Sequence, residues 1–153
     1  MNEAAATSQA KTPPPAWVIE PLADDDQAAF ESVIDLLRDY NAPFLGRTTM
    51  QRFRLAVLDA QRRIVGGLLG EFRSHWLHID ILVLHASLRG SGTGRALMQQ
   101  AEGAARERGC HGIWLDTFDF QAPAFYEHLG YTRFGTIENF HDGHARTFYE
   151  KRL

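Results

Sequence analysis

Three glycines fall within five positions of the chain, between an apolar segment and a segment with helical periodicity. The run reads Arg89-Gly90-Ser91-Gly92-Thr93-Gly94, and Arg95 follows it. Glycines let the backbone approach a ligand closely, and N–H groups at a helix N-terminus bind anions. Thr93 is a candidate helix cap, and the two arginines add positive charge. The run therefore predicts either an anion-binding loop suited to a pyrophosphate or only a tight turn from strand to helix.

Two common nucleotide-binding loops do not match this run. No Gly-Lys-Ser or Gly-Lys-Thr follows the glycines, as a P-loop requires. The spacing of Gly90, Gly92 and Gly94 also differs from the G-x-G-x-x-G of dinucleotide-binding folds. A nucleotide-binding regulatory domain is therefore disfavoured.

The composition limits the classes of protein to which the chain can belong. Its 153 residues, 44% of them hydrophobic, suit one domain. A net charge of −3 provides no basic excess for nucleic acid, and no apolar stretch approaches the roughly 20 residues that cross a bilayer. A single cysteine, Cys110, and an N-terminus without signal-peptide features favour a cytoplasmic location. We expect neither nucleic acid nor membrane as a partner.

Residues 1–15 are small and polar and end in three prolines, so we expect a disordered tail ahead of a domain at residues 16–153. Within that domain the helical periodicity begins at residues 24–26 and ends at Asn41-Ala42-Pro43. A second helix follows the glycine run and ends before Gly109, and a third begins at Pro123. Strands are predicted at residues 17–19, 53–59, 63–72, 76–84, 113–115, 131–137 and 146–151. The order indicates an α+β domain with a mixed sheet.

Two motifs together resemble the GCN5-related N-acetyltransferase (GNAT) family. Arg89-x-x-Gly92-x-Gly94 after Leu82-Val83-Leu84 is similar to the family's motif A. Ala122-Pro123-Ala124-Phe125-Tyr126-Glu127-His128-Leu129-Gly130-Tyr131 is similar to its later motif. The resemblance covers residues 17–153 and is sharpest over residues 82–131. It implies a single-domain fold in which a central, twisted mixed sheet of about six to seven strands is flanked by helices.

The resemblance also implies an activity, which is direct transfer of acetyl from acetyl-CoA to a primary amine of a small molecule or peptide. Tyr126 would be the general acid, because a phenol with a pKa of about 10 is protonated at neutral pH. The backbone at Leu82 and Leu84 would hold the pantetheine and polarise the thioester carbonyl. The amides of Gly90, Ser91, Gly92, Thr93 and Gly94 would hold the pyrophosphate, beside Arg89 and Arg95.

The general base and one cofactor contact are less well defined by the sequence. Glu71, His78 and Asp80 are candidates for the base, with Glu71 ranked first and Asp80 as the alternative. Asp119 replaces an asparagine that is common in the family and that contacts pantetheine, so Asp119 is the candidate for this cofactor contact and Gln121 is the alternative. Loss of that asparagine leaves this contact open.

Histidine pairs in the sequence do not predict a metal site. His75-x-x-His78 lies on a predicted strand, where residues three apart point to opposite faces, and His141-x-x-His144 has no cysteine or carboxylate set to complete it. We therefore expect acetyl-CoA as the donor and no metal. The alternative function is a non-catalytic acyl-CoA sensor. Edge strands of such a fold often pair between subunits, so a homodimer is a further expectation.

Overall fold

The computed structural model describes residues 17–46 and 50–153, so the predicted tail at residues 1–15 lies outside the described part of the chain. The described residues divide into two units, one up to Pro43 and one from Phe44 to Leu153. Each unit is described here by itself. The first contains most of α1 (Gln27–Leu45), and the second contains the sheet and the other helices.

Helix α1 begins at Gln27, directly after the predicted start at residues 24–26. The Ala29 amide donates to the Asp26 carboxylate at 2.9 Å, which caps the helix. The predicted end at Pro43 is wrong, because α1 continues to Leu45. Pro43 lies in the last turn, where its missing N–H removes a single hydrogen bond near the helix end. The predicted strand at residues 17–19 is also wrong, since these residues form no ladder with any described segment.

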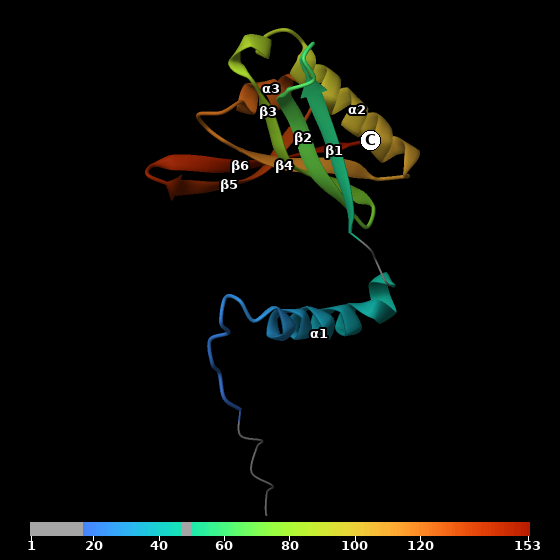
Figure 1. Cartoon of the computed structure of the whole chain (residues 1–153), viewed down its shortest axis with the longest axis vertical. Helices are drawn as coiled ribbons and strands as arrows, with labels where there is room; N and C mark the ends of the chain where they lie inside the picture. The colour runs from blue at the N-terminus through green and yellow to red at the C-terminus, as the bar shows by residue number, and fades with distance from the viewer. Residues whose placement is uncertain (1–16, 47–49) are drawn as a thin grey trace, which may run out of the picture. The chain divides into compact units, whose positions relative to one another are not determined.

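The second unit is built on a six-stranded mixed sheet with the strand order β1-β2-β3-β4-β6-β5 (Figure 1). Only the β3–β4 pair is parallel, and the other four ladders are antiparallel. The predicted α+β fold with a mixed sheet is thereby confirmed. The strands are β1 (Gln51–Leu58), β2 (Ile64–Arg73), β3 (Trp76–Leu84), β4 (Gly112–Phe118), β5 (Thr132–His141) and β6 (His144–Arg152).

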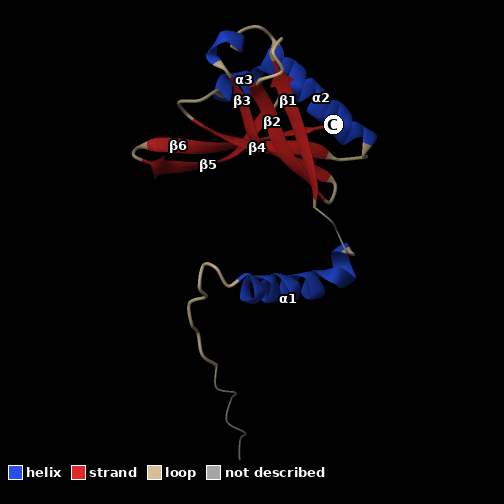
Figure 2. Cartoon of the chain, in the orientation of Figure 1, coloured by secondary structure: helices blue, strands red, loops and turns tan. Residues whose placement is uncertain are grey.

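Two helices pack against one face of this sheet, α2 (Thr93–Glu107) and α3 (Pro123–His128) (Figure 2). Leu97, Met98, Ala101 and Ala105 form the apolar stripe of α2 and are buried in the core, as their spacing predicted. Strands β2, β3, β4 and β6 and the α3 region supply the facing residues, which are Leu68, Phe72, Leu77, Ile79, Ile113, Leu115, Tyr126, Leu129, Tyr131 and Tyr149. The core therefore fixes both helices to the same face.

The end of α2 also follows the sequence pattern. Gly109, with φ of 67°, comes directly after the cap residue Arg108, in the left-handed conformation that favours glycine. The start of α2 differs from the prediction. Gly92 is the N-cap residue, with φ of 86°, and Thr93 is the first helical residue. Thr93 therefore does not cap the helix.

Candidate functional site

A cavity of about 1010 Å³ opens between the C-terminal half of β3 and the β4–α3 region. Its size is that of a binding site for a large ligand. Six segments line it: β3, the short 3-10 turn η1 (Ala86–Leu88) with the glycine run, the start of α2, the end of β4, the loop between β4 and α3, and α3. The lining residues are Asp80, Ile81, Leu82, Val83, Leu84, Leu88, Arg89, Gly90, Gly92, Gly94, Arg95, Asp116, Thr117, Phe120, Gln121, Ala122, Phe125 and Tyr126.

The cavity exists because the two parallel strands separate. The β3–β4 ladder pairs residues 76–79 with residues 112–115 and then ends. From residue 81 to residue 84, β3 continues to pair with β2 on its other side. The edge of β3 that faces β4 therefore has free backbone N–H and C=O groups, which can pair with a ligand. Leu82 and Leu84 lie on this segment, as the motif comparison requires.

A β-bulge lies at the fork between the two strands. Leu69 pairs with Ile81 and Gly70 with Ile79, so Asp80 has no partner on β2. A Cβ atom on Gly70 would lie 2.3 Å from the His78 carbonyl oxygen, so only glycine fits opposite the bulge. Bulges change the direction of a side chain and are common beside active sites. Here Asp80 is the extra residue of the bulge, and it lines the cavity.

The glycine run forms the N-terminal end of α2. Gly90 and Gly92 have φ of 75° and 86°, and open space surrounds the position of a Cβ atom at each. The amides of Gly94 and Arg95 lie in the first helical turn, where no intrahelical acceptor exists. The N-cap residue Gly92 provides no side-chain cap, and the Thr93 amide donates to the Ser91 hydroxyl oxygen at 3.4 Å, which leaves the Gly94 and Arg95 amides free. This end can therefore bind an anion through free N–H groups and the helix dipole.

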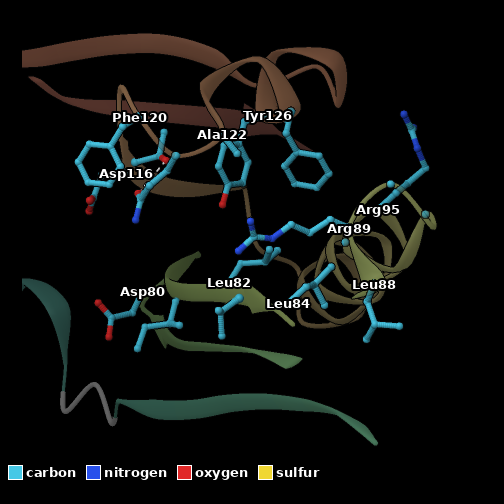
Figure 3. A pocket seen from close by; sticks show the side chains of 18 residues that line it. Asp80, Leu82, Leu84, Leu88, Arg89, Arg95, Asp116, Phe120, Ala122 and Tyr126 are labelled. Atoms are coloured by element: carbon cyan, nitrogen blue, oxygen red, sulfur yellow. Dashed lines mark hydrogen bonds between the residues drawn. The ribbon is translucent and has the colours of Figure 1, made fainter. Parts of the chain in front are cut away.

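Two hydroxyl groups of the run are turned to internal hydrogen bonds. The Ser91 hydroxyl donates to the Leu88 carbonyl at 2.6 Å and lies 2.7 Å from the Thr93 hydroxyl. Neither Ser91 nor Thr93 is among the residues that line the cavity, whereas Arg89, Gly90, Gly92, Gly94 and Arg95 are. Figure 3 shows the Arg89 side chain reaching from the loop into the cavity.

Gly94 serves close packing rather than a special backbone angle. A Cβ atom there would lie 3.2 Å from Cζ of Phe125, which precedes Tyr126 on α3. We expect Gly94→Ala to displace Phe125 and to lower kcat/KM for the transfer that the sequence resemblance implies about 3- to 10-fold, because small misplacements at a reacting centre are costly. Gly103→Ala, on the same helix with open space around it, is the matched control. It should leave kcat/KM unchanged and raise stability by about 1 kcal/mol. Equal kinetics in the two variants would contradict this coupling.

Tyr126 lies in the cavity wall between the loop and the fork (Figure 3). Its side chain is 6% exposed. Burial, and secondly the negative charge of Asp116, raise the pKa of Tyr126 to about 12. None of the hydrogen bonds found in the described part of the chain uses its hydroxyl, which is therefore available to a ligand. A phenol in this setting remains protonated at neutral pH and can donate a hydrogen bond or a proton.

Two carboxylates lie at the fork. Asp80 and Asp116 are the first residues of β3 and β4 beyond the last ladder pair, Ile79 with Leu115, and both line the cavity. The Asp116 carboxylate accepts from Nε of Arg146 at 2.6 Å. Asp80 takes part in no hydrogen bond or ion pair within residues 17–46 and 50–153. Asp116 was not among the predicted site residues, although a charge within the apolar run of β4 was a visible signal.

The other candidates for a base lie outside the cavity lining. The Glu71 carboxylate forms an ion pair with Arg73. The His78 ring stacks on Trp114 with centroids 3.7 Å apart, and both ring nitrogens are buried without a hydrogen-bond partner among the described residues. Burial lowers the pKa of His78, so this ring is neutral at pH 7.

Asp119 and Gln121 fix the loop that follows β4. The Asp119 carboxylate accepts from the Ala145 amide at 3.2 Å and lies 2.9 Å from Nδ1 of His144, and these contacts lower the pKa of Asp119. Asp119 does not line the cavity, whereas Gln121 does. The Gln121 side-chain oxygen accepts from the Phe118 amide at 2.9 Å. Its amide nitrogen is the group that can reach a ligand.

The described residues contain neither a metal-binding cluster nor a membrane-spanning helix. No group of three or more His, Cys, Asp or Glu side chains within residues 17–46 and 50–153 is arranged to hold a metal ion. In the same residues, no helix has both the length and the apolar character of a membrane span.

Comparisons with known proteins extend the similarity over most of the chain. Residues 13–131 match the sequence model of the acetyltransferase (GNAT) family. An acetyltransferase of Agrobacterium fabrum is 30% identical over 137 residues, which cover 90% of this chain and 98% of the relative. The crystal structure of an acetyltransferase from Bacillus cereus is 35% identical with a TM-score of 0.79, covering 88% of this chain and 98% of that one. A blasticidin-S acetyltransferase of Streptomyces morookaense is 43% identical over 91 residues, which are 59% of this chain and 67% of the relative.

Proposed function

The chain belongs to the acetyltransferase (GNAT) family, and on that premise we propose that it transfers acetyl from acetyl-CoA to a primary amine with Tyr126 as the general acid. The observation that carries this proposal is a single cavity that joins three features: the glycine loop, the free edge of β3 and the Tyr126 hydroxyl. Free amides and Arg89 suit a pyrophosphate at one end. The β3 edge suits the amide groups of pantetheine, which would place the thioester near Tyr126.

The proposed reaction is one direct transfer. The neutral amine nitrogen attacks the thioester carbonyl carbon, and the carbonyl oxygen becomes an oxyanion held by backbone amides of the Leu82–Leu84 segment. The C–S bond then breaks as the C–N bond is completed. The leaving sulfur receives a proton from the Tyr126 hydroxyl, and the amine proton leaves through the base and water. The products are an N-acetyl amine and CoA as a thiol.

We assign the base role to Asp80 in preference to Glu71. Asp80 lies in the cavity wall without a partner in the described structure, whereas Glu71 is paired with Arg73 outside the cavity lining. A carboxylate in this position attracts the ammonium form of the acceptor and passes its proton to water. We expect Asp80→Asn to lower kcat/KM for amines about 10-fold and to leave the KM for acetyl-CoA unchanged.

The acceptor and assembly are also part of the proposal. The similarity to a blasticidin-S acetyltransferase supports blasticidin S as one acceptor to test. Strands β1 and β5 are the two edges of the sheet, and pairing of such edges between copies would form a homodimer. The single cysteine, Cys110, is buried, which suits a cytoplasmic enzyme.

Release of CoA thiol tests the proposed function against a non-catalytic sensor. Acetyl-CoA is incubated with the protein and with primary amines, including blasticidin S, and thiol release is followed with and without each amine. Amine-dependent release is the expected result. Tight binding of acetyl-CoA, measured by calorimetry, without amine-dependent release would instead support the sensor, for which the buried and available Tyr126 hydroxyl would have no role.

A further inference from the structure

An exposed aromatic ring lines the fork end of the cavity, near Asp116 and across the cavity from Asp80 (Figure 3). Phe120 is 60% exposed and belongs to the cavity wall. Its ring stacks on Phe118, with centroids 5.2 Å apart and planes at 17°. The His144 ring supports it edge-on at 4.8 Å. We call Phe118, Phe120, Phe140 and His144 the aromatic shelf.

Hydrogen bonds hold this shelf in place. Asp119 joins the loop to β6 through its contacts with His144 and the Ala145 amide, and its own amide donates to the Ala145 carbonyl at 3.1 Å. The Gln121 amide donates to the Phe118 carbonyl at 3.0 Å. The position of Phe120 is therefore set before any ligand binds, so little ordering entropy opposes contact with it. A fixed, exposed ring inside a cavity is suited to a flat ligand group.

Arg146 packs against the aromatic shelf but is not among the residues that line the cavity. The Arg146 guanidinium lies 5.0 Å from the centre of the Phe140 ring and 5.9 Å from that of Phe118. Its Nε is bound to Asp116, so this arginine joins the shelf to the fork. Because the Arg146 guanidinium packs over the Phe118 and Phe140 rings, the Asp116 carboxylate that it binds is restrained as well.

The charges at the fork leave one carboxylate to be balanced by a ligand. Asp116 is paired with Arg146, Glu71 is paired with Arg73, and His78 is neutral. Asp80 is the carboxylate at the fork that forms no hydrogen bond or ion pair with a described residue, and the charge of Arg146 acts on Asp80 as well as on Asp116, so these three groups together leave one negative charge. One ammonium group balances it, whereas a second cation on the ligand would have no described counter-charge at the fork.

We infer that the acceptor is a monoamine that carries a flat ring, with its ammonium group at Asp80 and its ring on Phe120. The inference rests on the proposed function, because it names the class of amine that reaches the acetyl group. The one unbalanced carboxylate selects a single positive charge. The fixed ring of Phe120 selects a flat group over a puckered one of equal size, because ring faces stack only when both are planar.

The test compares 2-phenylethylamine with 2-cyclohexylethylamine. The two amines have the same carbon skeleton and one ammonium group, but only the first has a flat ring. We expect kcat/KM to favour 2-phenylethylamine about 2- to 10-fold in the wild type. Phe120→Leu, which keeps apolar volume and removes the flat face, should bring the ratio to about one. It should leave the KM for acetyl-CoA unchanged.

The matched control is Phe134→Leu. Phe134 is 57% exposed on β5, packs near Phe148 and does not line the cavity, so this variant should keep the wild-type ratio. An equal kcat/KM for the two amines in the wild type would overturn the inference. An equal loss for both amines in Phe120→Leu, or a change confined to the KM for acetyl-CoA, would overturn it as well.

A binding measurement separates this inference from the proposed function. If neither amine supports release of CoA, binding of each amine to the CoA-loaded protein is measured by calorimetry. Preferential binding of 2-phenylethylamine that is lost in Phe120→Leu would then support the ring site while refuting acetyl transfer to these amines. Equal or absent binding of both would refute the ring site.

Discussion

We expect Tyr126→Phe to lower kcat for acetyl transfer about 100-fold while the melting temperature stays the same. General acids contribute about 100- to 10,000-fold to kcat, and the lower end applies here. Because the pKa of Tyr126 is raised to about 12, complete proton transfer to a thiolate of pKa about 8.5 is uphill. The hydroxyl therefore donates a hydrogen bond to the departing sulfur first and transfers its proton only as the C–S bond breaks, after which water returns a proton to the phenolate. Steady-state kinetics and thermal unfolding of both proteins measure the two effects.

The absence of a described hydrogen bond from the Tyr126 hydroxyl makes this variant informative. Phenylalanine keeps the ring that packs against Tyr131 and Tyr149, so the fold loses no contact of the hydroxyl. A fall in kcat then reports chemistry rather than folding. An unchanged kcat would remove Tyr126 from the mechanism and would favour the sensor.

The dependence on pH provides a second check on Tyr126. Its folded pKa lies above the ordinary value of about 10 for a phenol, because burial favours the protonated form. The contribution of this burial to stability is complete below about pH 10 and is lost as the pH rises toward about 12. We expect the ratio of wild-type to variant kcat to be constant between about pH 6 and about pH 10. At higher pH the variant should become the more stable protein.

The parts of the site that the sequence predicts are those that depend on local chain geometry. Glycines at a helix start mark left-handed backbone and close packing, and the structure uses Gly92 for the first and Gly94 for the second. Strand β3 has the predicted bounds, residues 76–84. The cap was assigned to Thr93 because hydroxyl residues are favoured there, whereas a left-handed Gly92 occupies the cap position and leaves the Gly94 and Arg95 amides free.

The fork could not be read from the sequence because it depends on where a ladder ends. Asp80 and Asp116 are 36 positions apart in the chain, and they become neighbours in the sheet only because the β3–β4 pairing stops one residue before each. The exposure of Phe120 likewise depends on the hydrogen bond between Asp119, in the loop after β4, and the start of β6. Such long-range pairings leave no periodic signal in either segment. Asp116 and Phe120 were therefore missed as site residues.

A buried ion pair between α2 and β6 is the basis of the second large effect. Nζ of Lys151 lies 2.8 Å from Glu102 Oε1 and donates to the Leu129 carbonyl at 2.8 Å. The Glu102 and Lys151 side chains are only 10% and 24% exposed. Burial and the negative charge of Glu102 together raise the pKa of Tyr131, which shows that this carboxylate acts in a poorly solvated place. Because Leu129 is the C-cap residue of α3, the same lysine also holds the end of the helix that carries Tyr126.

We expect Lys151→Met to lower the free energy of unfolding by about 3 kcal/mol, because it leaves the buried Glu102 carboxylate without its nearest cation. Arg106 remains 3.5 Å away, which keeps the cost at the lower end for such pairs. The melting temperature should fall by about 6–12 °C. Arg63→Met is the control. The Arg63 side chain, which pairs with Asp59, is itself 75% exposed, so its loss should cost under about 1 kcal/mol.

The double variant Glu102→Gln/Lys151→Met separates charge from packing. If the cost of Lys151→Met comes from an uncompensated charge, removing that charge should recover more than half of the lost free energy of unfolding. No recovery would mean that Lys151 acts through its contact with the Leu129 carbonyl, and α3 would then loosen in both variants. In that case kcat would fall with stability, because Tyr126 lies on the same short helix. A cost equal to that of Arg63→Met would contradict the buried-pair account altogether.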